Sequence, residues 1–345
     1  MPSFILKKNV PFTTLTTFKI GGEAKYLAEV KNKEELKEAV AFAKKKDLPI
    51  FVLGGGSDIL ISDAGFDGVV VKYVGESVNF RQEGKSVDVT AAAGLTWDKL
   101  VANVVNKNLQ GIECLSGIPG SVGASPIQNI GAYGQEIKDA FVSLSAYDIQ
   151  KEEFVVLAKK DCGFSYRESI FKKPEAKGRY IITDITLKLK KGGEPLVAYE
   201  SLKSYLKGKG IKNPTLSQIR EAVLDLRGQR LEDPRVIGNA GSFFKNPIIT
   251  KGEFSQIKKN YPQMPYHEVS GSKVKLFAGW LIENAGWRGR TYKNTKVSDK
   301  NALVIVNPEG KATAKEVREL AEKISDDVYQ KFGVRLEPEV QYIGF

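Results

Sequence analysis

The amino-acid sequence predicts an α+β fold of about two domains. Three observations support this prediction. Strand-like runs alternate with helical patterns between residues 26 and 190, two segments of this region are rich in glycine, and a stretch of Gly, Lys and Pro near 191–214 precedes a second set of elements. With 345 residues, of which 42% are hydrophobic, the chain is long enough to bury a sizeable core.

The first predicted elements are a strand, a helix and a strand. Tyr26–Val30 has the composition of a strand. Asn32 and Glu35 have the spacing of a capping box, and the helix that they begin is predicted to run through Lys46. Pro49–Leu53 is an apolar strand that ends at a glycine run. The apolar face of the helix contains Leu36, Ala39, Val40 and Ala43.

The glycine run, Gly54-Gly55-Gly56-Ser57, does not fit a Rossmann dinucleotide site, because that site requires a helix directly after the glycines. The residues that follow, DILISDAGFDGVVVKYV, are β-branched and strand-like. Consecutive backbone N–H groups of glycines can still form an anion-binding nest for a pyrophosphate. A plain turn is an equally weighted alternative.

The rest of this region continues with strands and one helix. Val87–Ala93 is a predicted strand, and Thr96 begins a helix whose apolar residues include Leu100 and Val104. Val142–Ile149 and Tyr180–Lys190 are further predicted strands. We expect the whole region to form one α+β domain whose two glycine-rich loops face one ligand.

The second glycine-rich segment, CLSGIPGSVGASPIQNIGAYGQ (Cys114–Gln135), has no charged residue in 22 positions. At the composition of the chain about six would be expected. Its five glycines cost conformational entropy, and its Ser, Asn and Gln side chains form hydrogen bonds without charge. A backbone wrapped around a large bound molecule explains this composition, and a buried loop of small residues is the alternative.

The second set of elements begins with another capping box, formed by Thr215 and Gln218. A helix is expected around Leu276–Ile282, and Thr313 with Glu316 begins a helix that Gly333 ends. The last segment, VRLEPEVQYIGF (334–345), is predicted as a strand with Pro338 at an edge or irregular position. Alternation places Glu337 and Glu339 on one face, about 7 Å apart, either as an acid/base group or as a solvated face.

The composition excludes some classes of site. The net charge of +11 suits nucleic acid or phosphorylated ligands, but no single face or aromatic-rich segment collects the charge. The N-terminus has no export signal, and two cysteines fit a reducing cytoplasm. With one histidine, His267, which we expect at the surface, no metal site is predicted. Redox chemistry then requires an organic cofactor.

Two further segments carry polar side chains in apolar surroundings. Ser242 follows a glycine turn and precedes two phenylalanines, so either its hydroxyl is poised to give up a proton in a dry site or the segment is a turn before a buried strand. Arg167, beside Tyr166, offers a bidentate contact to a carboxylate or phosphate. The alternative for Arg167 is an ion pair with Glu168 or Asp161.

Seven segments occur in an order that resembles one enzyme family: TTFKIGG, LGGGSDILI, IPGSVGASPIQNIGAYG, CGFSYRESIF, GNAGSFFKNP, AGWLIENAGWRG and LEPEV. They are similar to the UDP-N-acetylenolpyruvoylglucosamine reductases, flavoenzymes of peptidoglycan precursor synthesis, over residues 15–344. The resemblance implies a vanillyl-alcohol-oxidase (PCMH)-type FAD-binding domain in two α/β lobes (1–75 and 76–210), a substrate-binding α+β domain (211–333) and a C-terminal strand (334–345) returning to the active site. The insertion that carries Tyr199 is similar to the long form of the family, in which a tyrosine loop closes over the substrate.

By that resemblance, NADPH passes a hydride to non-covalently bound FAD, and the enolpyruvyl nucleotide sugar then enters the same site. Flavin N5 delivers the hydride to the vinyl carbon, Ser242 donates the proton, and Arg167 with Glu339 stabilises the enolate-like intermediate. A fixed arginine is suited to the negative charge that develops on the carboxylate. Glu339 would need to be protonated or water-mediated, so we expect a raised pKa for it, and Lys245 or Arg230 is expected to make Ser242 a usable acid.

The resemblance also implies the binding residues. For the cofactor these are Gly54, Gly55, Gly56, Ser57, Asp58, Ile118, Pro119, Gly120, Gly123, Ala124, Ile127, Gly131, Tyr133 and Arg227. For the substrate they are Tyr166, Arg167, Tyr199, Arg230, Lys245 and Asn246. The sequence departs from the family pattern at Asp58, usually Asn, at Arg230, often Lys, and at Asn301, often His or Gln.

Two rival interpretations of the sequence are possible beside this resemblance. One is another FAD-dependent oxidase or dehydrogenase of the same fold, and the other is a basic nucleic-acid-binding protein. We expect a monomer that acts on a nucleotide sugar in the cytoplasm and does not bind nucleic acid or a membrane.

Overall fold

The computed structural model describes residues 3–269 and 271–345, and the chain forms two compact units. Unit 1 contains residues 3–10, Ala24–Gly55 and Asp67–Gly228. Unit 2 contains Pro11–Glu23, Gly56–Phe66 and Gln229–Phe345. Each unit therefore combines stretches that are far apart in the sequence, and the domain limits expected from the sequence remain a prediction.

The first sheet of unit 1 is covered by helix α1 (Lys33–Lys45), and β3 and β5 run parallel in it. Helix α1 begins as predicted, because the side chain of Asn32 accepts the N–H of Glu35 at 2.8 Å. Its predicted apolar face is buried against strand residues such as Val69 and Val71. The strands, in sheet order, are β1 (Ile5–Pro11), β2 (Glu23–Val30), β5 (Phe66–Tyr73) and β3 (Ile50–Val52).

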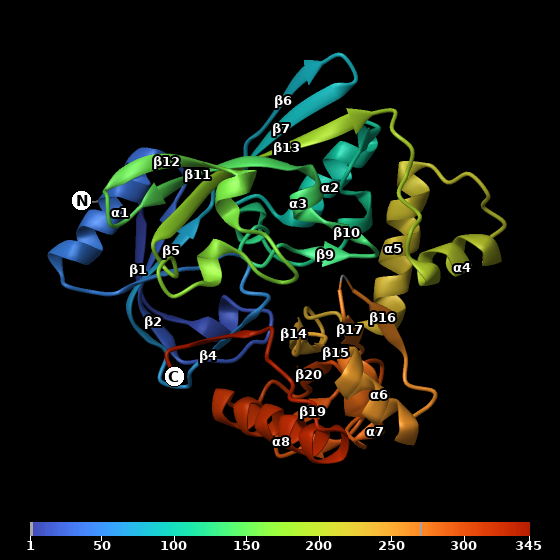
Figure 1. The fold of residues 1–345 in the computed structure, drawn as a ribbon. Coiled ribbons are helices and arrows are strands. Elements are labelled where there is room, and N and C mark those ends of the chain that lie inside the picture. The colour runs from blue at the N-terminus through green and yellow to red at the C-terminus, as the bar shows by residue number, and fades with distance from the viewer. Residues whose placement is uncertain (1–2, 270) are drawn as a thin grey trace. The chain divides into compact units, whose positions relative to one another are not determined.

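The second sheet of unit 1 is antiparallel and packs against helix α2 (Trp97–Asn106) (Figure 1). The three strands predicted for this region lie within one residue of their expected ends. In sheet order the strands are β12 (Glu153–Ala158), β11 (Phe141–Asp148), β13 (Tyr180–Lys191), β7 (Ser86–Ala92) and β6 (Val78–Glu83), and β8 (Leu109–Gln110) also pairs with β13. The shorter elements of the unit are β9 (Gly131–Ala132), β10 (Gln135–Glu136), α3 (Ile137–Ala140) and 3₁₀ turns at Glu113–Leu115, Val122–Ala124, Lys159–Cys162 and Ile170–Lys172.

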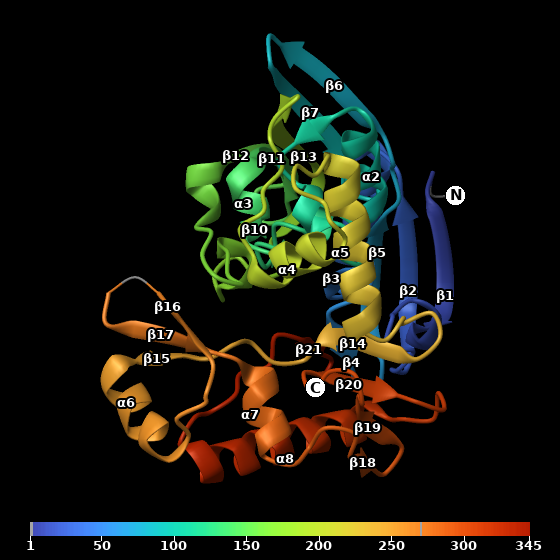
Figure 2. The same ribbon diagram turned by 90° about the vertical axis from the view of Figure 1, so that its right-hand side faces the viewer.

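Helices α4 (Glu200–Gly208) and α5 (Leu216–Arg230) lie side by side (Figure 2). The predicted capping box of α5 is present, since the N–H of Gln218 donates to Oγ1 of Thr215 at 3.2 Å and the N–H of Thr215 donates to Oε1 of Gln218 at 2.9 Å. The apolar faces of the two helices form one cluster with Cys114: Leu202, Leu206, Ile219, Ala222, Val223 and Leu226.

In the residues of unit 2 that the structure describes, two antiparallel sheets and one parallel strand pair pack with three helices around one core. One sheet is β14 (Gly238–Ser242), β20 (Val304–Asn307), β19 (Thr295–Val297) and β18 (Thr291–Tyr292), and the other is β15 (Ile248–Thr250), β17 (Lys273–Leu276) and β16 (Tyr266–Glu268). The parallel pair is β4 (Ile59–Ile61) with β21 (Gln341–Ile343), the helices are α6 (Lys251–Asn260), α7 (Ala278–Asn284) and α8 (Ala314–Phe332), and a 3₁₀ turn covers Phe12–Thr14.

Two predicted elements of unit 2 differ from the structure. The helix expected over Leu276–Ile282 is α7, which begins at Ala278, because the residues before it pair with β15 and β16. The strand expected over 334–345 is limited to β21, and Pro338 forms only an isolated bridge with Phe244. The irregular position predicted for Pro338 is therefore confirmed. His267 is exposed as predicted, although it lies on strand β16.

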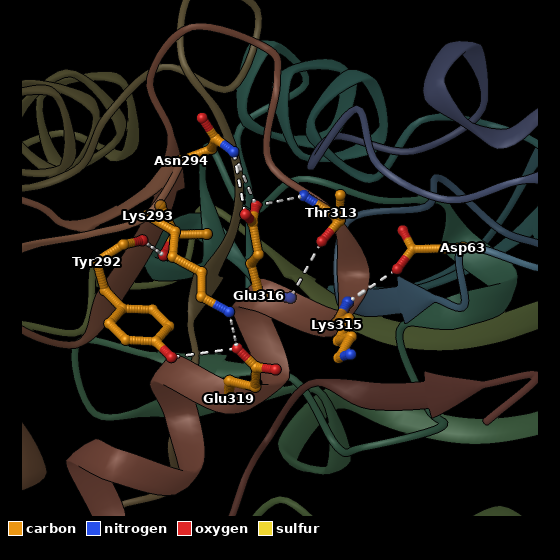
Figure 3. A network of polar contacts seen from close by, with 9 residues as sticks. Asp63, Tyr292, Lys293, Asn294, Thr313, Lys315, Glu316 and Glu319 are labelled. Carbon is orange, nitrogen blue, oxygen red and sulfur yellow. Dashed lines mark hydrogen bonds and ion pairs between the residues drawn. The ribbon is translucent and has the colours of Figure 1, made fainter.

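The N-terminus of α8 is held by the acidic side chain of Asp63, which lies outside the helix, as well as by its own capping box (Figure 3). Thr313 and Glu316 form the predicted box, and Gly333 ends the helix in the left-handed conformation with φ 70°. The carboxylate of Asp63 accepts the N–H groups of Ala314 and Lys315 at 2.8 and 3.0 Å. Negative charge at this end of a helix is stabilising, so Asp63 ties the segment 56–66 to α8.

Across the part of the chain that the structure describes, no helix has both the length and the apolar composition needed to span a bilayer.

Candidate active site

The two glycine-rich segments of unit 1 are in direct backbone contact. A β-carbon on Gly55 would lie 2.6 Å from Cα of Gly120, and one on Gly54 would lie 2.9 Å from Cβ of Ala124 and from Oγ of Ser121. Such distances are shorter than side chains tolerate, so glycine is required here by packing between the two segments. Both segments were predicted to bind the cofactor, and the structure places these residues together.

The last glycine of the run, Gly56, belongs to unit 2 and has a left-handed backbone with φ 64°. Thr17 binds it, because the N–H of Thr17 donates to the carbonyl of Gly56 at 2.9 Å. The hydroxyl of Thr17 donates to the carbonyl of Asn239 in β14 at 2.7 Å. Thr17 thus connects the end of the glycine run to the strand that carries Ser242. The carbonyl of Asp58 accepts the N–H of Gln341 in β21, and the cofactor contacts expected for Ser57 and Asp58 remain predictions.

Gly117, at the start of the charge-free segment, has both backbone polar groups bound by charged side chains. Its N–H donates to Asp98 at 2.6 Å and its carbonyl accepts from Nε of Arg227 at 3.1 Å. Asp98 also forms a bidentate ion pair with Arg220 of α5, at 2.6 and 2.7 Å. Burial raises the pKa of Asp98, but the bonds from Arg220 and Gly117 outweigh burial and hold this pKa below its ordinary value. The segment contains no charged residue, but Asp98 and Arg227, which lie outside it, bind its backbone at Gly117.

The middle of the segment is also fixed by the rest of unit 1. The N–H of Gly123 donates to the carbonyl of Ala93 at 2.9 Å, and a β-carbon on Gly123 would lie 2.6 Å from Cβ of Ala93. Ile118 and Ile127 are partly buried against the core, whereas Pro119 is exposed.

One side-chain oxygen of the segment fits a bound ligand. Oε1 of Gln128 is buried and accepts no hydrogen bond from any residue that the structure describes. A buried acceptor of this kind normally has a partner, and a ligand that brings an N–H or O–H group would supply it. The segment is uncharged and rich in side chains that form hydrogen bonds, and a flavin ring also offers uncharged donors and acceptors. The residues present therefore fit FAD.

Arg167 lies beside the charge-free segment with a left-handed backbone, φ 55°. Its Nη2 donates to the carbonyl of Gly131 at 3.0 Å, and its guanidinium lies 5.6 Å from the ring centroid of Tyr166. Burial lowers the pKa of Arg227. The charges of Tyr133 and Asp98 oppose this change, whereas the positive charge of Arg167 lowers the pKa of Arg227 further. Two guanidinium groups near enough to interact make this part of unit 1 favourable for an anion.

In unit 2, Ser242 ends strand β14 directly after a distortion of the strand. The pairing of β14 with β20 shifts register between Asn239 and Ser242, and Gly241 has φ 72°. The side-chain oxygen of Asn239 accepts the N–H of Gly241 at 3.0 Å and so stabilises the bulge. Ser242 itself is partly buried. The bulge fixes the backbone from which its hydroxyl projects.

Glu339 is paired with the residue that follows Ser242. The N–H of Glu339 donates to the carbonyl of Phe243 at 2.8 Å, and the N–H of Lys245 donates to the carbonyl of Glu337 at 2.9 Å. The whole residue Glu339 is 9% exposed, whereas the side chain of Glu337 is 71% exposed and forms an ion pair with Lys245 at 2.6 Å. Alternation treated the two residues alike, whereas the structure leaves Glu337 exposed and Glu339 buried. The expectation that their carboxylates share one face remains a prediction.

The residues predicted for catalysis divide between the two units. Ser242 and Glu339 are brought together in unit 2 by backbone pairing, and Arg167 belongs to unit 1. Of the predicted substrate residues in unit 2, Arg230 is exposed at the end of α5, and Oδ1 of Asn246 accepts the N–H of Ala278 at 2.9 Å and so caps α7.

The sequence interpretation missed four residues that organise the site. Thr17 and Asn239 lie inside segments that carried the family resemblance, so those segments held the signal. Gln128 lies in the charge-free segment as well. Asp98 is a single acidic residue in the first turn of a helix, and the pattern around it gives no indication of its partners.

Comparison with known proteins first defines a class. A family model described as "FAD binding domain" matches residues 24–157. The first part of the chain is therefore an FAD-binding domain, and the predicted vanillyl-alcohol-oxidase type of fold is confirmed. A second family model, described as "UDP-N-acetylenolpyruvoylglucosamine reductase, C-terminal domain", matches residues 229–343.

Relatives that span the whole chain define the family. The chain is 39% identical over 341 residues to UDP-N-acetylenolpyruvoylglucosamine reductase of Flavobacterium johnsoniae, which covers 98% of this chain and 99% of the relative. It is 41% identical over 339 residues to the enzyme of the same name from Ralstonia nicotianae, with 97% and 98% covered. The crystal structure of UDP-N-acetylenolpyruvylglucosamine reductase from Thermus caldophilus is similar with a TM-score of 0.69 and 26% identity, over 99% of both chains. This chain belongs to the family of UDP-N-acetylenolpyruvoylglucosamine reductases.

Proposed function

We propose that this protein reduces the enolpyruvyl ether of UDP-N-acetylglucosamine to UDP-N-acetylmuramate, with NADPH as the reductant and FAD as the bound cofactor. The observation that carries the proposal is the relationship to these reductases along the whole chain, at 39% and 41% identity. Another FAD-dependent oxidase or dehydrogenase of the same fold is the alternative. The C-terminal match over residues 229–343 favours the reductase.

When bound, FAD would supply hydride transfer, from NADPH and onto the vinyl carbon of the substrate. The residues that would hold it are the glycine run, the charge-free segment and Arg227, for which the packed glycines and the buried acceptor of Gln128 give support. The neutral part of the site suits ring and ribityl groups, and the basic residues suit phosphates.

Three residues of the chain are assigned to the substrate. Arg167 would stabilise the negative charge that develops on the substrate carboxylate, since a fixed guanidinium needs no reorganisation during the reaction. Ser242 would donate the proton to the carbon next to the one that receives the hydride. Glu339 would assist Arg167, and the raised pKa expected for it remains a prediction.

The remaining expectations concern the surroundings of the site. Lys245 forms an ion pair with Glu337. The negative charge of Glu337 would offset part of the field by which Lys245 is expected to stabilise the anion of Ser242. Tyr199 would close over the substrate as in the long form of the family. We also infer that the protein acts as a monomer. We infer that it acts in the cytoplasm, because free cysteines such as Cys114 and Cys162 fit a reducing compartment.

The experiment that tests the proposal is steady-state turnover of the purified holoprotein. We expect a yellow protein that consumes more than one equivalent of NADPH per flavin only when the enolpyruvyl nucleotide is added, and a product that is heavier by two hydrogens. Peroxide production with NADPH consumption independent of that nucleotide would favour the alternative oxidase. A colourless protein would contradict both.

A further inference from the structure

Two consecutive buried residues of unit 1 bind both backbone polar groups of Leu196. Oε1 of Glu113 accepts the N–H of Leu196 at 3.1 Å, and Sγ of Cys114 donates to the carbonyl of Leu196 at 3.3 Å. Burial, and secondarily the charge of Glu113, raise the pKa of the Cys114 thiol to about 12, so the thiol retains the proton that it donates. Both side chains are fully buried, and water cannot replace these bonds.

The carboxylate of Glu113 accepts from three donors. Besides Leu196, it accepts the N–H of Gly111 at 2.8 Å and Nε2 of Gln135 at 3.5 Å. Oε1 of Gln135 in turn accepts the N–H of Cys114 at 3.0 Å. Cys114 and Gln135 are the two ends of the charge-free segment, so one network closes that segment and attaches Leu196 to it. An ionised carboxylate, which only accepts, is the side chain that suits three converging donors.

The residues after Leu196 continue along the same segment. A β-carbon on Gly134 would lie 3.5 Å from Cβ of Ala198, and the ring of Tyr133 meets the ring of Tyr199 edge-on with centroids 5.7 Å apart. Residues 196–199 thus run beside residues 133–135. Tyr199 is also the N-cap of α4, whose buried leucines pack against Cys114.

We propose that Glu113 is the positioning residue for Tyr199 in the binding of the nucleotide-sugar substrate. By holding Leu196 against the base of the charge-free segment, it fixes where residues 196–199 begin and thereby places the ring of Tyr199 against Tyr133. The proposal rests on the proposed function, which gives Tyr199 its substrate contact. Glu113 itself is too deeply buried within its network to be assigned a contact with the substrate.

The test is a double-mutant cycle on the holoenzyme with Glu113→Gln and Tyr199→Ala. The amide of Gln would turn an NH₂ group toward one of the backbone donors, so we expect KM for the enolpyruvyl nucleotide to rise about tenfold with kcat changed less than about threefold. In the Tyr199→Ala background the same change should alter KM by less than about twofold, because the two residues act together. An unchanged KM, or an equal factor in both backgrounds, would overturn the proposal.

Glu35→Gln is the matched control. Glu35 is another buried carboxylate of unit 1, 6% exposed, that accepts a backbone N–H, from Lys31 at 2.9 Å. We expect no change of KM in this variant. If Glu113→Gln fails to accumulate as folded protein, Cys114→Ala removes the other bond to Leu196 and should raise KM about threefold, again only when Tyr199 is present.

Amide hydrogen exchange separates this inference from the proposed function. A wild-type protein that does not turn over the enolpyruvyl nucleotide contradicts the proposed function, whereas the attachment of Leu196 is tested without turnover. We expect Glu113→Gln, and not Glu35→Gln, to speed exchange of the amides of residues 196–199. Exchange that is equal in wild type and Glu113→Gln would contradict the attachment itself.

Discussion

Gly55 and Gly120 lie in direct contact, because a β-carbon on Gly55 would stand only 2.6 Å from Cα of Gly120. Gly54 and Gly55, the part of the glycine run that belongs to unit 1, are therefore packed directly against the charge-free segment, and both segments are predicted to bind FAD. Close packing between the two segments requires glycine at these positions. The density of glycine, which indicates a bound ligand, therefore has this packing as a second physical cause. Cofactor binding and loop packing are consequently expected to fail together.

Gly55→Ala should reduce FAD binding by at least about tenfold, because the methyl group must push one glycine segment away from the other. Flavin content and FAD affinity of the purified apoprotein measure this effect. Gly252→Ala in α6 is the control, since the nearest atom to its added β-carbon is 3.8 Å away. Wild-type FAD affinity in Gly55→Ala would show that the contact between the two segments does not shape the cofactor site.

Asp98→Asn should lower the free energy of unfolding by about 1–2 kcal/mol at neutral pH, a modest figure because the carboxylate is one-third exposed. The pKa of Asp98 is lowered in the folded protein, so its contribution is present above the unfolded pKa of about 4 and is lost as pH falls through the folded pKa. Urea unfolding of both proteins between neutral and acidic pH measures the difference. The gap between them should narrow below about pH 4, and a gap that widens there would contradict the account.

Both cysteines should be unreactive in the folded protein. Burial, and secondarily the charges of Glu113 and Asp161, raise the pKa of Cys114 and of Cys162 to about 12. At pH 8 about one thiol in ten thousand is then ionised, and the thiolate is the reactive form. A disulfide reagent should therefore release its chromophore only after denaturant is added. Rapid reaction of either thiol in the native protein would mean that its surroundings are open.

Asp63→Ala should destabilise unit 2 by about 1–3 kcal/mol, because two backbone N–H groups at the start of α8 lose their acceptor. Thermal and urea unfolding measure this change. Asp67→Ala is the control, since Asp67 is 83% exposed and forms only a surface ion pair with Lys25. Equal effects of the two substitutions would mean that the interaction drawn in Figure 3 does not stabilise the helix.

Local features of the fold could be predicted from the sequence. Three helix N-termini were predicted from pairs of residues three positions apart, and the capping interactions of Asn32, Thr215 and Thr313 are all present in the structure. The start of α7 was misplaced because Lys273–Leu276 is held as a strand by partners on both sides, which no short window of sequence contains.

Contacts between distant positions could not be predicted. Glu113 binds Leu196 and Asp98 binds Arg220 across 83 and 122 positions of the chain, and neither carboxylate belongs to a pattern. Alternation also treated Glu339 like Glu337, whereas the structure buries Glu339 and leaves Glu337 exposed. The residues themselves indicated the two glycine-rich segments, Ser242 and Arg167 as candidates, whereas the individual roles came from the resemblance and remain proposals.

In the proposed reaction FAD carries the hydride and Ser242 supplies the proton. The most direct measurement is the two anaerobic half-reactions of Ser242→Ala, followed by flavin absorbance, with Ser255→Ala on the surface of α6 as the control. NADPH should bleach the flavin of Ser242→Ala at nearly the wild-type rate, and the enolpyruvyl nucleotide should restore its colour about a hundredfold to ten-thousandfold more slowly. Recovery of colour at the wild-type rate in Ser242→Ala would contradict the claim.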